Sequence, residues 1–207
     1  MLVLIGGLPG VGKTTLAREL AGRLRAAHVR IDAVEAALVR SGLVAGQDDV
    51  GGAGYELALA MAGTCLQAGT DVVVDAVFPV AASRAPFAEL AAATGTPVRW
   101  VRLVCGDRAE HRRRVEQRHA DLPGHVVPSW QQVARRDVDA WTEPHVVVDT
   151  AGPDPLGAVE AALTAALTPE ATRRTGRIAA ATVHREGSAD PGELGGAGDA
   201  EPVGRAP

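Results

Sequence analysis

The sequence predicts an α/β fold in which a parallel sheet is covered by helices on both faces. Short valine-rich runs alternate with longer stretches of helical period, which is the pattern of a doubly wound sheet. The runs are continuously apolar and do not alternate with polar residues, as expected for parallel strands buried on both faces. The predicted strands are 2–5, 28–31, 72–74, 98–104 and 145–148.

Each predicted helix has its own local signal. The first, 13–26, places Leu16, Leu20 and Leu24 on one face. Helices over 33–40, 55–68 and 79–94 follow, and the last two end before a glycine. Helices that begin with capping residues are predicted from Asp107 to 119, from Ser129 to 141 and from Asp154 to 167.

The remaining segments are predicted to be loops. Residues 41–54 are glycine-rich and polar, which favours a mobile loop or the edge of a lid. After residue 168 the apolar period is lost and Gly, Ala, Pro, Glu and Arg dominate. We therefore expect one folded domain over 1–168 and a disordered tail over 169–207.

Composition excludes several classes of protein. Among the 207 residues no apolar run approaches the ~18 needed to span a membrane, and the N-terminus does not resemble a signal peptide. Cytoplasmic location and no membrane partner are expected. The net charge of −4 counts against nucleic acid as a partner without excluding it. The two cysteines fit neither a metal site nor a disulfide framework.

The first strand leads into a glycine-rich turn that matches the phosphate-binding pattern G-x-x-x-x-G-K-[ST]. Backbone N–H groups of such a loop point at an anion, and the helix dipole adds positive charge. In this pattern Lys13 contacts the β- and γ-phosphates, and the hydroxyl of Thr14 binds Mg²⁺. The predicted nucleotide-binding residues are Gly7, Leu8, Pro9, Gly10, Val11, Gly12, Lys13, Thr14 and Thr15.

The scarcity of two residue types, lysine and asparagine, indicates which class of nucleotide-binding protein this is. Lys13 is the only lysine, so a compact ammonium is retained where the planar fork of arginine would fit badly. The chain contains no asparagine, which excludes the N-K-x-D motif of common guanine-specific switches. The small size favours a kinase that transfers a phosphoryl group from ATP to a separate acceptor.

A kinase of this kind needs carboxylates beside the phosphates. Asp32 follows the second strand and is the predicted base, although it also suits a helix N-cap. Glu35, one turn later, is a further acceptor contact or an exposed helix charge. Asp75 ends the third strand and is the carboxylate predicted to lie beside Mg²⁺; we also predict that it contacts the acceptor. Asp149 ends an identical V-V-V-D run and is an alternative for the carboxylate beside Mg²⁺.

Arginines complete the predicted site. Arg114 and Arg118 are spaced i, i+4 on one helix face, where a lid helix could present both guanidiniums to the transferred phosphoryl group. The alternative is a solvated basic face. Arg84 lies on the helix that follows Asp75 and either holds the acceptor or is a surface residue. Arg135 and Arg136 are weaker candidates, and His125 is the one histidine to watch in the loop.

The motifs GGLPGVGKTTLAREL, RIDAVEAAL, DVVVDAVFPVAASR, VRLVCGDRAEHRRRVEQR and TEPHVVVDT, in this order, resemble the P-loop small-molecule kinases. This group includes chloramphenicol phosphotransferase, zeta-toxin-like kinases and polynucleotide-kinase-like domains, and the resemblance covers residues 1–167. It implies a three-layer α/β/α sandwich with strand order 2-3-1-4-5 and a small helical lid. It also implies that Asp32 is the catalytic base and that the lid arginines are Arg114 and Arg118.

The resemblance implies an ATP- and Mg²⁺-dependent kinase that phosphorylates a hydroxyl of a small molecule such as an antibiotic or a sugar. Two alternatives stay open: a nucleotide or polynucleotide 5′-hydroxyl kinase, and a toxin-like or regulatory nucleotide-binding protein. Polynucleotide-kinase-like members often have an arginine shortly after the base aspartate. Here Ala33, Val34 and Glu35 occupy that stretch, and the sequence identifies neither the acceptor nor the oligomeric state.

Overall fold

The computed structural model describes residues 1–165 of the chain. Five strands form its sheet: β1 (Leu2–Gly6), β2 (Ala27–Arg30), β3 (Val72–Asp75), β4 (Val98–Val104) and β5 (His145–Asp149). The helices are α1 (Lys13–Leu24), α2 (Ile31–Arg40), α3 (Ala53–Gln67), α4 (Ala81–Ala93), α5 (Arg108–Glu116), α6 (Trp130–Ala134) and α7 (Pro155–Ala165), with a short 3₁₀ turn at Gln47–Asp49. The predicted tail lies outside the described residues.

All strand pairs are parallel, and the strand order is β2-β3-β1-β4-β5, which confirms the predicted topology. The central strand β1 pairs with β3 on one side and β4 on the other, so that Ile5 aligns with both Asp75 and Val101. The carboxyl ends of the strands therefore meet at one edge of the sheet. In open α/β sheets this is the edge at which ligands bind.

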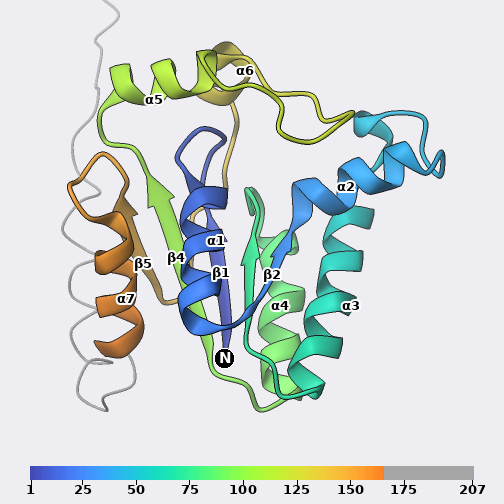
Figure 1. Ribbon diagram of the computed structural model, residues 1–207, viewed down its shortest axis with the longest axis vertical. Helices are drawn as coiled ribbons and strands as arrows, with labels where there is room; N and C mark the ends of the chain where they lie inside the picture. The colour runs from blue at the N-terminus through green and yellow to red at the C-terminus, as the bar shows by residue number, and fades with distance from the viewer. Residues whose placement is uncertain (166–207) are drawn as a thin grey trace, which may run out of the picture.

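Helices cover both faces of the sheet, as the continuous apolar strands predicted. One face packs on α1 and α7 through residues that include Leu16, Leu20 and Val159. The other face packs on α3 and α4 around Phe78, which contacts Phe87 edge-to-face at 5.5 Å between ring centroids. In Figure 1, α5 and α6 lie across the carboxyl edge, above the loop that joins β1 to α1.

Capping explains where several helices begin. Asp107 accepts hydrogen bonds from the backbone N–H groups of Ala109 and Glu110 at the start of α5. Ser129 and Gln132 form the full capping box predicted for α6. Asp154 accepts from the N–H of Gly157, which places Pro155 in the first turn of α7. No helix within the described residues is long and apolar enough to cross a membrane.

The predicted helix over 129–141 is wrong beyond Ala134. The chain leaves α6 because residues after it bind elsewhere: the N–H of Asp139 donates to Pro79 O, and its carboxylate accepts from the N–H of Ala81. This route carries Trp141 under β4, where it packs on Trp100 at 5.8 Å between ring centroids. The apolar spacing therefore predicts correctly that Trp141 is buried, but Trp141 does not lie on a helix.

Two further predictions of local structure need correction. Asp32 is not a helix N-cap, since α2 begins at Ile31 and Asp32 lies in its first turn. The helix that carries Arg114 ends at Glu116, so Arg118 lies beyond it. The two arginines therefore do not share a helix face, and their guanidiniums contact different parts of the molecule.

Candidate functional site

The loop between β1 and α1 has the geometry of an anion cradle. Gly7, Gly10 and Gly12 all adopt positive φ angles, 144°, 85° and 90°. A Cβ at Gly7 would lie 2.4 Å from the carbonyl oxygen of Leu103, and one at Gly10 would lie 2.4 Å from Val115 of α5. Glycine is therefore required at both positions, for conformation and for space. The loop ends at the N-terminus of α1, whose free N–H groups face the cradle.

Helix α5 also holds this loop from the other side. The Nε2–H of His111 donates to the carbonyl oxygen of Pro9 at 2.9 Å, and the imidazole is buried. The same ring packs edge-to-face on Trp130 of α6. The short lid helices and the phosphate loop are thus one packed unit, which the sequence motif alone does not reveal.

Lys13 is positioned by the loop itself. Its Nζ donates to the carbonyl oxygen of Leu8 at 3.0 Å. Loss of water around the ammonium lowers the pKa of Lys13 to about 8, and this outweighs the opposing effect of the Asp32 and Asp75 carboxylates. A poorly hydrated ammonium is stabilised strongly by a neighbouring anion, because the charges are weakly screened.

Asp75 ends β3, next to the phosphate-loop strand. Its side chain is 1% exposed and accepts a hydrogen bond from Nε2 of His28 at 3.2 Å. Asp149, the alternative, is exposed at the end of β5, which β1 and β4 separate from β3. There it accepts from the N–H groups of Gly106 and Ala151, which lowers its pKa and orders two turns. The structure therefore gives Asp149 a role in turn geometry.

Asp32 lies under a lid loop, which we define as residues 117–129. Its carboxylate is 3.6 Å from Arg30, 3.8 Å from Arg118 and 3.9 Å from His125. These separations are too long for hydrogen bonds, so the Asp32 oxygens remain available to accept one from a hydroxyl. Burial lowers the pKa of His125, and the Asp32 carboxylate opposes that shift.

The lid loop is anchored over Asp32 at two points. Arg30 forms a two-pronged ion pair with Asp121, at 2.5 and 3.0 Å, and this contact lowers the pKa of Asp121 to about 2. The N–H of Val126 donates to the side chain of Gln47 at 2.7 Å. The glycine-rich segment predicted as a lid edge therefore does meet the lid loop, through Gln47.

Glu35 lies on α2 one turn after Asp32 and close enough for the two charges to interact. Burial, and secondly the nearby Asp32 charge, raises the pKa of Glu35 to about 7. Its side chain packs against α3 at Gly54, where a Cβ would lie 2.5 Å from Glu35 Cγ. Within residues 1–165 the carboxylate has no ion pair or hydrogen bond. Glu35 is therefore poised to exchange a proton near neutral pH.

Glu35→Gln is expected to change the pH dependence of stability. The pKa of Glu35 in the folded protein is raised above the ordinary glutamate value of 4.5. The protonated carboxyl therefore stabilises the fold at low pH, and this contribution is lost as the pH rises through about 7. The variant should unfold like the wild type at pH 4 but be more stable at pH 8 by on the order of 2 kcal/mol. Urea unfolding at both pH values measures the difference.

Glu56→Gln provides the control, because Glu56 is an exposed carboxylate in the first turn of α3. This change should leave the pH dependence intact. If Glu35→Gln changed the free energy of unfolding equally at pH 4 and pH 8, protonation of Glu35 would not be the cause of the pH dependence.

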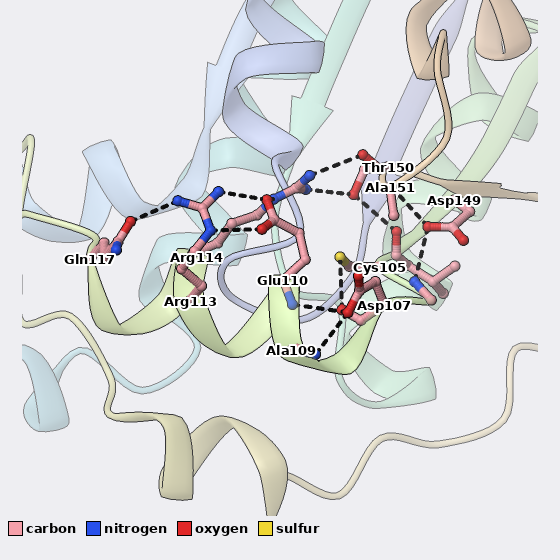
Figure 2. A network of polar contacts seen from close by, with 12 residues as sticks. Cys105, Asp107, Ala109, Glu110, Arg113, Arg114, Gln117, Asp149, Thr150 and Ala151 are labelled. Atoms are coloured by element: carbon pink, nitrogen blue, oxygen red, sulfur yellow. Dashed lines mark hydrogen bonds and ion pairs between the residues drawn. The ribbon is translucent and has the colours of Figure 1, made fainter.

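Arg114 belongs to a network that ties α5 to the turn after β5 (Figure 2). Its guanidinium donates to Glu110 at 2.8 Å, to the hydroxyl of Thr150 at 3.0 Å and to the Thr150 carbonyl at 3.2 Å. It also lines a cavity of about 340 Å³ beside Gly12 and Thr15. Arg114 thus sits on the α1–α7 side of the phosphate loop, while Arg118 sits over Asp32.

Arg84 is buried and its contacts do not include Asp32 or Lys13, contrary to both the predicted acceptor contact and the surface alternative. The side chain is 0% exposed and packs 5.1 Å from the ring centroid of Trp141. Its donors are occupied by Glu143 at 3.0 Å and by the carbonyl oxygens of Phe78 and Ala140. Arg84 therefore holds the segment after α6 against β3 and α4, and a role in acceptor binding is not supported by this position.

Arg84→Met should destabilise the protein without impairing ligand binding. Methionine fills a similar volume but leaves Glu143 without its cation, at a loss of about 3 kcal/mol. Adding Glu143→Gln should recover part of that loss because no stranded charge remains. Thermal unfolding of both variants measures this, and a large rise in the KM for ATP in folded Arg84→Met would contradict the structural role.

Sequence reasoning undervalued Arg136. Its charge lowers the pKa of Lys13 and also acts on Glu35 and Tyr55, so it lies near all three. The chain reaches this position only because α6 stops at Ala134. No local pattern distinguishes Arg136 from Arg135, because the two are adjacent residues of the same type.

The residues at this edge fit a magnesium–nucleotide complex. The cradle, the desolvated Lys13 and the α1 N-terminus suit a polyphosphate. Thr14 follows Lys13, and the buried Asp75 is a carboxylate of the kind that Mg²⁺ prefers as a ligand. Within residues 1–165 no cluster of three His, Cys, Asp or Glu could hold a metal ion by itself. A cation here would depend on phosphate oxygens, as Mg²⁺ commonly does.

Comparison with solved structures finds the same fold. A candidate kinase from Chloroflexus aurantiacus is 24% identical with a TM-score of 0.60, covering 79% of this chain and 96% of that one. A gluconokinase from Sinorhizobium meliloti is 23% identical with a TM-score of 0.54, covering 78% and 90%. Kti12 from Chaetomium thermophilum, in complex with ADP-AlF3, is 18% identical with a TM-score of 0.59, covering 81% and 100%.

Sequence comparison identifies the family. No curated protein matches the chain. The family model described as AAA domain matches residues 2–136, which include the phosphate loop, Asp32, Asp75 and both lid arginines. The chain therefore belongs to the AAA domain family, with the P-loop fold that its motifs predicted.

Proposed function

We propose that the protein is an ATP- and Mg²⁺-dependent phosphotransferase that moves the γ-phosphoryl group onto a hydroxyl of a small molecule. The observation that carries this proposal is the position of Asp32, whose charge acts on Lys13 while its oxygens remain free of hydrogen bonds within residues 1–165. The likeness in fold to a gluconokinase and a sugar kinase supports a hydroxylated acceptor.

The side chains have distinct roles in this proposal. Asp32 accepts the proton of the acceptor hydroxyl as the oxygen–phosphorus bond forms. Lys13 and Arg118 stabilise the negative charge that spreads over the transferred group and the departing ADP. Thr14 and Asp75 hold Mg²⁺, which when bound neutralises phosphate charge. Arg114, beside Gly12 and Thr15, contacts the nucleotide on the other side of the loop.

A coupled assay of ADP formation across hydroxylated metabolites, sugars and antibiotics tests the proposal. An acceptor should raise ADP formation well above the rate with water alone, and mass spectrometry should find one added phosphoryl group on it. A DNA or RNA oligonucleotide belongs in the same screen, because the polynucleotide kinase alternative predicts labelling of a 5′-hydroxyl. Tight ATP binding without transfer to any acceptor would instead favour the regulatory alternative.

The extent of the active domain is testable in the same assay. We propose that residues 1–168 carry the activity, since the phosphate loop, Asp32 and the lid all lie within residues 1–165. A chain truncated after residue 168 should retain transfer activity. A regulatory protein that acts through its tail would lose its function instead.

A further inference from the structure

A second cavity lies beside the phosphate loop, on the side of β4. Its volume is about 370 Å³, which is the size of many small-molecule sites. Three parts of the chain form it: Gly7, Leu8 and Val11 of the phosphate loop, the carboxyl end of β4, and the segment after α6. The cavity of about 340 Å³ that Arg114 and Thr150 line shares no residue with this one, so the two cavities are distinct.

Two arginines line this second cavity. Arg102 lies on β4 between Val101 and Leu103, which pack on the α1 face, so strand alternation places Arg102 on the opposite face. Arg136 enters from the segment after α6. Within residues 1–165 neither side chain has an ion pair or a hydrogen bond, unlike Arg84 and Arg114.

The charge and the walls of the cavity indicate what it binds. Two arginines face one carboxylate, Asp137, so the lining carries an excess of positive charge. Trp141 supplies a flat apolar wall that packs on Trp100 and lies against Gly6, where a Cβ would be 2.4 Å from its ring. Guanidiniums bind carboxylates and phosphates in two-pronged geometry. This lining suits a small organic anion whose body packs on an aromatic ring.

The cavity adjoins the proposed reaction centre. Leu8 lines it, and the Leu8 carbonyl oxygen accepts from Lys13 Nζ at 3.0 Å. Arg136 also lines it and acts electrostatically on Lys13 and Glu35. The cavity therefore shares Leu8 with the surroundings of Lys13, and Arg136 belongs to both.

We infer that the acceptor is a small hydroxylated organic anion whose negative group binds Arg102 and Arg136 in this cavity. This inference rests on the proposed kinase function and adds the class of substrate to it. Asp32 and the two arginines then divide the recognition, since the hydroxyl meets Asp32 and the anionic group meets the guanidiniums.

Matched pairs of compounds that differ only in a carboxylate test the inference in the full chain with Mg²⁺ and ADP. Suitable pairs are gluconate with sorbitol, glycerate with glycerol, and 3-hydroxybutyrate with 1,3-butanediol. Thermal shift and calorimetry should detect binding of a carboxylate but not of its neutral partner. Arg102→Gln and Arg136→Gln should each weaken that binding by at least about tenfold, as loss of a charged hydrogen bond predicts.

Two further variants make the test specific. Arg135→Gln removes an exposed neighbouring arginine that does not line the cavity and should leave binding unchanged. Arg102→Lys keeps the positive charge and should recover part of the affinity. Thermal unfolding of each variant without ligand shows whether it is folded.

The outcomes separate this inference from the proposed function. Equal binding of neutral and carboxylated partners, no binding of any carboxylate, or full binding by folded Arg102→Gln would overturn the inference. ADP formation with neutral alcohols that survives Arg102→Gln would overturn it too and leave the kinase proposal standing. Carboxylate binding that is lost in Arg102→Gln, without phosphoryl transfer to any compound, would overturn the proposed function and with it the acceptor role of the anion.

Discussion

Lys13→Arg is expected to lower kcat by at least about 100-fold while the protein remains folded, because loss of one charge-stabilising donor has an effect of this size. Lys13 Nζ reaches the Leu8 carbonyl oxygen from within the loop, at 3.0 Å. A guanidinium is larger and planar and presents its donors as a fixed fork. It cannot reproduce a compact ammonium in a cradle that α5 closes from the other side. Steady-state kinetics and thermal unfolding together measure the effect.

The reverse exchange on the same helix is the matched control. Arg18 is exposed on α1, and Arg18→Lys should leave both kcat and stability unchanged. Near-normal turnover by folded Lys13→Arg would mean that positive charge alone is required at this position, and the argument from the single lysine would fail.

Asp32→Asn is expected to lower kcat by about 10²- to 10⁴-fold, the range for loss of a general base. Asparagine keeps the shape of the side chain but cannot accept the hydroxyl proton. Within residues 1–165 no hydrogen bond or ion pair joins Asp32 to Thr14 or to the glycines of the loop, so the KM for ATP should change only a few-fold. Kinetics with the acceptor found in the screen give both constants, and calorimetry with ADP checks nucleotide binding.

Loss of a surface carboxylate should have no such effect. Asp48 is exposed in the 3₁₀ turn, so Asp48→Asn controls for the change in net charge. Full turnover by Asp32→Asn would exclude the base role. An equal fall in ATP affinity and in kcat would assign Asp32 to ordering of the lid through Arg30, Arg118 and His125.

Local sequence signals predicted most of the fold. Continuous valine runs identified buried parallel strands, and capping residues identified the starts of α5, α6 and α7. These signals depend on neighbours within a few residues, so they can be read without knowledge of the fold. The strand order came from the family resemblance and is confirmed.

The misplaced elements share a physical cause. Trp141 was assigned to a helix because it is apolar at helical spacing, yet tertiary contacts of Asp139 lead the chain away from α6. Arg84 was assigned to the acceptor because it follows Asp75, yet burial under Trp141 gives it a structural role. In both cases long-range contacts outweighed a local pattern.

By itself the sequence determined the phosphate loop, the single lysine within it and the carboxylates that end the second and third strands. These features depend only on residue types at fixed spacings, which can be read directly from the sequence. Only the tertiary structure decided that Arg114 and Arg118 lie on different sides of the loop, that Glu35 is buried enough for its pKa to approach 7, and that Arg136 lies near Lys13. Direction, burial and charge environment arise from segments far apart in the chain, and so they exist only once the chain has folded.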